Sequence, residues 1–202
     1  MTKLLVLSLR LLFFAGFSLL AAAGDSAALA RPIADQTAPS YDMKAQSALD
    51  LEMMQKKIVS LAEAIPAHKY TWRPEPGVRS ISELFLHIAA ANYNFPTMMT
   101  GVAPATGFEG KGFEKSTTDK ARVIEQLNKS FAYAIAAVNH MSNADFAKPE
   151  TKLGPEAIAG DVIYLMVTHA HEHLGQSIAY ARMNGVMPPW TAEAGKNPKP
   201  PE

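Results

Sequence analysis

The residues of this chain best suited to chemistry are its histidines. Three of the six fall within five residues, at His169, His171 and His173. On a helix, positions four apart share one face, so the rings of His169 and His173 would lie about 6 Å apart along the axis. That spacing allows two imidazoles to bind one metal ion, whereas His171 would point to the opposite, exposed side. Catalytic metal sites usually have three protein ligands, so a third ligand must come from elsewhere.

His87 is the candidate for that third ligand. It stands mid-helix in an apolar run, Leu84-Phe85-Leu86-His87-Ile88, whereas His68 lies in a proline-rich connector and His140 at the end of a predicted helix. A buried histidine can also be satisfied by a hydrogen bond to a carbonyl, and spacing alone supports both interpretations about equally. Sites in bundle cores are built from side chains on facing helices, which favours a ligand.

Composition restricts the chemistry. The chain has no cysteine, so disulfides, thiolate ligands and a catalytic thiol are excluded, and a metal must be held by nitrogen and oxygen atoms. Its 19 basic and 19 acidic side chains balance to a formal net charge of zero. Nucleic-acid binding requires a basic face, so we expect no nucleic-acid partner.

Four segments have apolar residues at helical spacing and predict helices over residues 42–65, 80–99, 118–141 and 161–184. Their ends carry stop and start signals: Pro66, a capping box at Ser80 and Glu83, and Gly185 as a left-handed cap. Pro96 could kink the second helix or end it. Tyr70 and Trp72, in the connector before it, are expected to fold back on the core. The stripe predicted to be buried in the third helix is Ala121, Ile124, Leu127, Phe131, Ile135 and Val138.

Apart from Pro96 and Gly175, the prolines and glycines after residue 42 lie outside these four helices. No alternating pattern predicts a strand, and there is neither an internal repeat nor a phosphate-binding glycine loop. The pattern therefore predicts an all-α fold, a four-helix bundle with long loops, over residues 42–190.

The two ends read differently. Residues 1–30 have a basic start, an apolar run and small residues, the order of a signal peptide with cleavage after Ala23 or Ala30. Residues 31–41 read as a linker and residues 191–202 as a flexible tail. We expect an exported protein, periplasmic or secreted, without stable membrane insertion after cleavage; an uncleaved membrane anchor is the alternative.

Two blocks of the sequence resemble signatures of the DinB family. One is Ser80-Ile-Ser-Glu-Leu-Phe-Leu-His87-Ile-Ala. The other is His169-x-x-x-His173-Leu-Gly-Gln176, which continues through residues 178–185 into Pro188-Pro189-Trp190, and the connector Tyr70-x-Trp72-Arg73-Pro74 fits as well. The resemblance implies an up-down-down-up bundle, one divalent metal held by His87, His169 and His173, and a homodimer.

The resemblance also implies a function class. Similar proteins include metal-dependent thiol transferases and metalloenzymes of unassigned reaction. Two features depart from that pattern: Leu174 stands where many relatives have a basic residue, and an exported protein would not meet cytosolic thiols. We therefore expect a metal-dependent transferase or hydrolase acting on a small molecule of unknown identity. The alternatives are a non-catalytic metal- or ligand-binding helical module and a purely structural bundle.

Three neutral imidazoles would leave a divalent ion its full charge and an open position, so that it acts as a Lewis acid. Zinc suits this ligand set best, with nickel, iron and manganese as alternatives. Helical spacing places further polar side chains near the ligand faces as weak catalytic candidates: Glu172, Gln176, Tyr180 and Asn94. For each of them a surface or supporting role is at least as well supported. The stretch is not the HExxH motif of zinc proteases.

Overall fold

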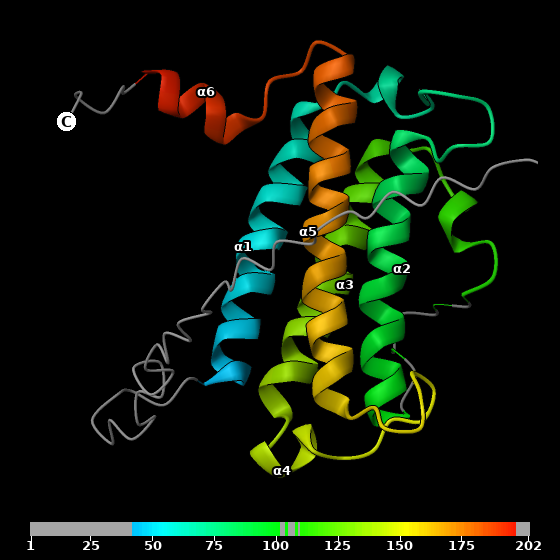
Figure 1. The fold of residues 1–202 in the computed structure, drawn as a ribbon. Helices are drawn as coiled ribbons and strands as arrows, with labels where there is room; N and C mark the ends of the chain where they lie inside the picture. The colour runs from blue at the N-terminus through cyan, green and yellow to red at the C-terminus, as the bar shows by residue number, and fades with distance from the viewer. Residues whose placement is uncertain (1–41, 102–103, 105–107, 109, 197–202) are drawn as a thin grey trace, which may run out of the picture. The chain divides into compact units, whose positions relative to one another are not determined.

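The computed structural model describes residues 42–101, 104, 108 and 110–196; the predicted signal peptide, the predicted linker and residues 197–202 lie outside this part. Four long helices dominate the described part (Figure 1). They are α1 (Met43–Ala64), α2 (Ile81–Thr100), α3 (Lys120–His140) and α5 (Ala159–Met183). The predicted all-α bundle is confirmed.

Side-chain caps set where these helices begin. Asp42 accepts a hydrogen bond from the backbone N–H of Ala45 at 3.0 Å, and Asp119 accepts one from that of Arg122 at 2.9 Å. The capping box of α2 is formed as predicted: the backbone N–H of Glu83 donates to Ser80 Oγ and that of Ser80 to Glu83 Oε2. Each cap satisfies a backbone donor that the first helical turn leaves without a partner.

The helices run up, down, down and up, as predicted (Figure 1). Lys120, at the start of α3, donates to the carbonyl of Ile65 at the end of α1, while Lys44 near the start of α1 donates to the carbonyl of Met141 after α3. These contacts make α1 and α3 antiparallel. Each of α1 and α2 packs against both α3 and α5, so α2 and α5 are neighbours in the bundle.

The connector between α2 and α3 has to cross the length of the bundle because these two helices are parallel. A helix of 20 residues is about 30 Å long, so a short turn cannot join them. On its way back the connector forms the 3₁₀ helix η3 (Phe113–Lys115) beside the start of α2, where Glu114 pairs with Arg79. This return brings Glu114 of the connector beside His87 of α2.

Burial follows most of the predicted pattern. The apolar residues at helical spacing are buried in both α1 and α2: Ala48, Leu51, Met54, Ile58 and Leu61 in α1, and Ile81, Leu84, Phe85, Ile88 and Tyr93 in α2. Tyr70 is fully buried, and its hydroxyl donates to the carbonyl of Ala62 at 2.8 Å. Trp72 packs against the core as expected. In α3 the predicted Ala121 is exposed and Val123 is buried instead. Pro96 is buried inside α2, and the helix continues past it to Thr100.

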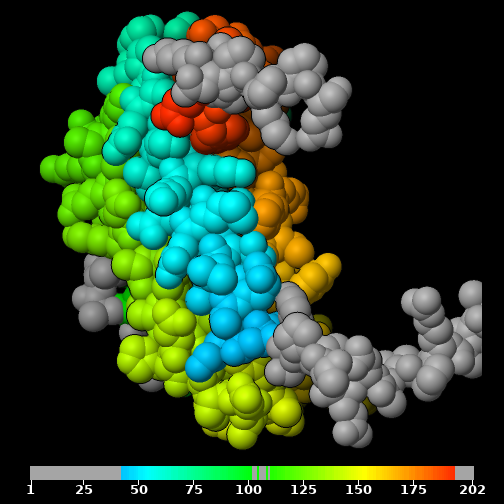
Figure 2. Space-filling view, turned by 90° about the vertical axis from the view of Figure 1, so that its left-hand side faces the viewer, coloured from blue at the N-terminus to red at the C-terminus, as the bar shows by residue number. Residues whose placement is uncertain are grey.

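Four short helices of the described part were not predicted: η3, given above, η2 (Ala67–Lys69), α4 (Asn143–Phe146) and α6 (Pro189–Lys196). Helix α6 packs against α1 (Figure 2). Lys57 Nζ of α1 lies 5.8 Å from the ring centroid of Trp190 in α6. The predicted boundary at residue 190 therefore falls inside a helix rather than at the start of a tail. Among the described residues, no helix is long and apolar enough to cross a membrane.

Candidate metal centre

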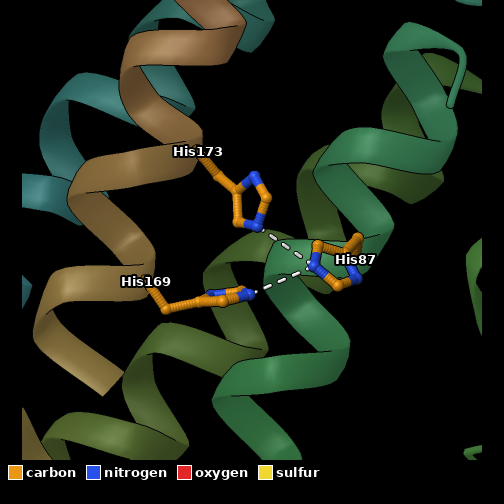
Figure 3. Close-up of side chains that lie close together, drawn as sticks. All are labelled: His87, His169 and His173. Carbon is orange, nitrogen blue, oxygen red and sulfur yellow. Dashed lines mark hydrogen bonds between the residues drawn. The ribbon is translucent and has the colours of Figure 1, made fainter. Parts of the chain in front are cut away.

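The three predicted ligands meet between α2 and α5. His87 comes from α2, and His169 and His173 lie one turn apart on α5 (Figure 3). The Nε2 atom of His87 is 3.1 Å from that of His169 and 3.1 Å from that of His173. Within the described residues these three form the one group of His, Cys, Asp or Glu side chains whose ligand atoms could together hold a metal ion.

The rings are partly shielded from solvent. His173 is buried, with 7% of its surface exposed, while His87 and His169 are half-buried. Phe95 presents a perpendicular ring to His169, with ring centroids 5.6 Å apart. The cluster thus has an apolar wall on the α2 side, which lowers the local dielectric around any charge placed there.

The other nitrogen of His87 is fixed by a carboxylate. Its Nδ1 lies 2.7 Å from Glu114 Oε1, and Glu114 also receives hydrogen bonds from Arg79 Nε at 2.7 Å and Nη2 at 3.2 Å. An ionised carboxylate only accepts, so His87 Nδ1 must carry the proton. In the neutral imidazole the Nε2 atom then presents a lone pair to the cluster.

His173 is oriented by an amide. Its Nδ1 lies 2.9 Å from Gln176 Oε1, and Gln176 Nε2 donates to the hydroxyl of Tyr180 at 3.1 Å. The amide oxygen accepts, so His173 Nδ1 also carries its proton and Nε2 again presents a lone pair. Tyr180 in turn packs edge-on against Trp72, with ring centroids 5.5 Å apart.

Two lone pairs that face each other at 3.1 Å repel unless a cation lies between them. One proton on His87 Nε2 could serve only one of its two neighbours, whereas a metal ion serves all three nitrogens. Zinc–nitrogen bonds of about 2.0–2.1 Å at a tetrahedral angle separate two ligand atoms by about 3.3 Å. The observed spacing and the second hydrogen bonds of His87 and His173 therefore fit a divalent metal.

Electrostatics keep the α5 ligands neutral. Burial, and then the neighbouring His173 and His87, lower the pKa of His169 to about 4. The pKa of His173 is also lowered, chiefly by burial. Because a metal competes with protons for imidazole nitrogen, both side chains are ready to bind a metal at neutral pH.

Glu114 differs from the histidines of α5, because hydrogen bonds and a neighbouring charge, and not burial, set the direction of its pKa shift. Burial alone would raise the pKa of its carboxyl, but hydrogen bonds from Arg79 and His87, together with the positive charge of Arg79, hold that pKa below its usual value. Glu114 is therefore ionised at neutral pH, as the assignment of the proton to His87 Nδ1 requires.

The weaker candidates separate into two pairs. Gln176 and Tyr180 join the cluster through the hydrogen bonds described above. Asn94 and Glu172 are exposed, and neither is hydrogen-bonded to a cluster histidine, although the charge of Glu172 acts on His173. The remaining histidines, His68, His140 and His171, are exposed, as predicted for His171.

Sequence reasoning missed Glu114, Arg79 and Phe95. Glu114 lies 27 residues from His87 in a glycine-rich connector, and no local pattern links the two. A polar pocket of about 440 Å³ is lined in part by Glu114 and Gln176, the partners of His87 Nδ1 and His173 Nδ1. Its polar lining comprises Arg73, Arg79, Glu83, Glu114, Lys115 and Gln176.

Comparison with known proteins adds a family. A family model described as the DinB superfamily matches residues 50–177, more than half of the chain. The matched region contains all three clustered histidines together with Glu114 and Gln176, and it ends before Tyr180. No curated protein matches the chain.

Proposed function

Because the chain belongs to the DinB superfamily, we propose that His87, His169 and His173 bind one divalent transition metal ion that serves as the centre of an enzyme. The observation that carries this proposal is the convergence of three Nε2 atoms, with the lone pairs of His87 and His173 facing each other at 3.1 Å. Without a cation between them, neutral histidines in this arrangement would destabilise the fold, because their lone pairs repel each other.

Zinc is the leading candidate for the ion, with nickel, iron and manganese as alternatives, since three imidazoles suit all four. Held by three neutral ligands, such an ion is a Lewis acid that can activate water or a thiol as a nucleophile. The protein's own part is to hold the rings: Glu114 orients His87, Gln176 orients His173, and Phe95 excludes water beside His169.

The reaction class we propose is transfer or hydrolysis on a small molecule, with a thiol or an ester as the first substrates to test. A catalytic site of this kind also needs a group that moves a proton. The hydroxyl of Tyr180 is our candidate for this group, because it is connected to His173 through Gln176.

One observation favours a second candidate, a non-catalytic metal-binding module. The polar groups around the cluster are already engaged: Glu114 binds Arg79 and His87, and Tyr180 binds Gln176. Asn94 and Glu172, the remaining candidates for proton transfer, are exposed. A centre without a free base would store or sense the metal rather than use it.

Elemental analysis of protein purified without an affinity tag tests the metal. We expect about one transition metal ion per chain in the wild type and none in the His169→Ala/His173→Ala variant. Absence of metal, even after reconstitution with zinc and nickel, would refute both candidates. Turnover of a thiol or ester by the metal-loaded protein, lost in the variant, would then separate the enzyme from the binding module.

We also propose export and self-association, both from the sequence resemblance and pattern. Residues 1–30 fit a signal peptide, and the family resemblance implies a homodimer. Cell fractionation tests export, and a purely cytoplasmic mature protein would refute it.

Light scattering on the purified chain tests the dimer, and a mass near 21.8 kDa for the full chain at all concentrations would refute it.

A further inference from the structure

We propose that Glu114 is a positioning residue of the metal centre, which fixes His87 so that Nε2 faces the ion and raises the basicity of that nitrogen. The inference rests on the proposed function, because it assigns a supporting group to the same centre. It starts from one contact: Glu114 Oε1 lies 2.7 Å from His87 Nδ1. In the described part of the chain, no other carboxylate is hydrogen-bonded to a cluster histidine.

Glu114 is itself held in place from two directions. Arg79 binds both of its oxygens, through Nε at 2.7 Å and Nη2 at 3.2 Å, and Arg79 immediately precedes the N-cap of α2. On the connector side, Phe113 packs on the core, with its ring centroid 6.1 Å from that of Tyr93. The carboxylate therefore has a fixed position relative to α2, which carries His87.

Gln176, the partner of His173, differs from Glu114 in charge. Gln176 accepts the Nδ1 proton of His173 with a neutral amide oxygen, whereas Glu114 does the same for His87 with an anion. A charged acceptor pulls the proton more strongly and leaves Nε2 a better electron donor. His87, the ligand supplied by α2, would thus be a stronger donor than His173.

A merely structural ion pair would behave differently. The side chains of Arg79 and Glu114 are 41% and 33% exposed, and pairs so exposed contribute little to the free energy of unfolding. Loss of Glu114 should therefore weaken metal binding strongly, while it lowers the free energy of unfolding of the apoprotein only slightly. This difference between two measurements separates positioning from simple stabilisation.

The first experiment measures zinc affinity by competition with a chromophoric chelator, for the wild type, Glu114→Gln and Glu114→Ala. We expect about 10–100-fold weaker binding in the alanine variant and an intermediate loss in the glutamine variant, which keeps an acceptor but no charge. Glu125→Gln, which removes an exposed glutamate paired with Lys129, is the control and should leave affinity unchanged. Affinities within about twofold of the wild type in both Glu114 variants would overturn the proposal.

The second experiment reads the proton directly. Nitrogen-15 NMR of labelled apoprotein should show His87 protonated at Nδ1 in the wild type, and a mixture of both tautomers in Glu114→Ala. An unchanged tautomer in that variant would overturn the proposal even if the protein bound metal. Failure of the wild type to bind any metal would instead refute the proposed function, so the two failures are distinguishable.

Discussion

At the scale of single residues, proton placement explains why this cluster is suited to a metal. A histidine becomes a ligand when its other nitrogen has a hydrogen-bond acceptor, because the acceptor determines which nitrogen keeps its lone pair. Glu114 and Gln176 supply those acceptors for His87 and His173. The cluster is therefore defined by five side chains rather than by three.

Removal of His87 should abolish tight metal binding. Two imidazoles on one helix remain in His87→Ala, and we expect zinc affinity to fall by more than the roughly 10–100-fold typical of losing a supporting group. Calorimetric titration measures the change. His140→Ala is the matched control, since His140 is exposed, lies outside the cluster and is hydrogen-bonded to the carbonyl of Ala136. Equal affinity in the two variants would remove His87 from the site.

The clustered histidines could be predicted from the sequence, but their supports could not. The spacing of His169 and His173 on a helix identifies the pair, and the apolar neighbourhood of His87 marks it as unusual. Glu114 could not be predicted, because its contact with His87 depends on the path of a long connector, which no local periodicity encodes. Asn94 shows the reverse: it has the right helical spacing from His87 but is exposed.

At the scale of helices, capping residues explain most of the boundaries. Asp119 caps α3, so that helix begins at Lys120 rather than at Thr118. Asp161 accepts from the backbone N–H of Ile158 from within the first turn, so α5 begins at Ala159, two residues before the predicted start. Helix α6 was missed because its two leading prolines read as a stop, although proline is tolerated in a first helical turn.

Loss of the α2 cap should destabilise the bundle. Ser80→Ala removes the acceptor for the backbone N–H of Glu83, and we expect a loss of about 0.5–2 kcal/mol in the free energy of unfolding. Urea denaturation followed by circular dichroism measures it.

Ser142→Ala is the matched control for that cap. Ser142 forms the same kind of capping box, but on the four-residue helix α4 at the bundle's edge, where it is exposed. Local fraying there should affect global unfolding much less, because the buried packing of the long helices remains. Equal losses in the two variants would contradict the importance assigned to the α2 cap.

At the scale of the whole bundle, a bound metal joins α2 to α5. Ligands from both helices have to be in place for binding, so metal binds the folded state preferentially and stabilises it. Zinc at about 100 times its dissociation constant should add about 2.7 kcal/mol, and raise Tm by about 5–10 °C for a chain of this size. Differential scanning fluorimetry measures the shift, which should vanish in His169→Ala/His173→Ala. A rise of equal size in that variant would locate the binding elsewhere.

The apoprotein should lose stability as pH falls from about 6.5 towards 4. An unfolded histidine has a pKa of about 6.5, whereas burial lowers the pKa of folded His169 to about 4. Between these values the unfolded state binds more protons, so the free energy of unfolding rises with pH and is lost on acidification. Above about 6.5 both states are neutral at this position, and the dependence on His169 disappears.

Thermal unfolding of metal-free protein between pH 7 and pH 5 tests this dependence before the carboxylates titrate appreciably. We expect Tm to fall by several degrees in the wild type and by less in His169→Gln, which has no group to protonate. His140→Gln should behave as the wild type, because that side chain is exposed. A flat profile in the wild type would mean that protons reach the cluster without unfolding it. Such a result would contradict the lowered pKa of His169, which follows from the burial of its ring and from the neighbouring histidines.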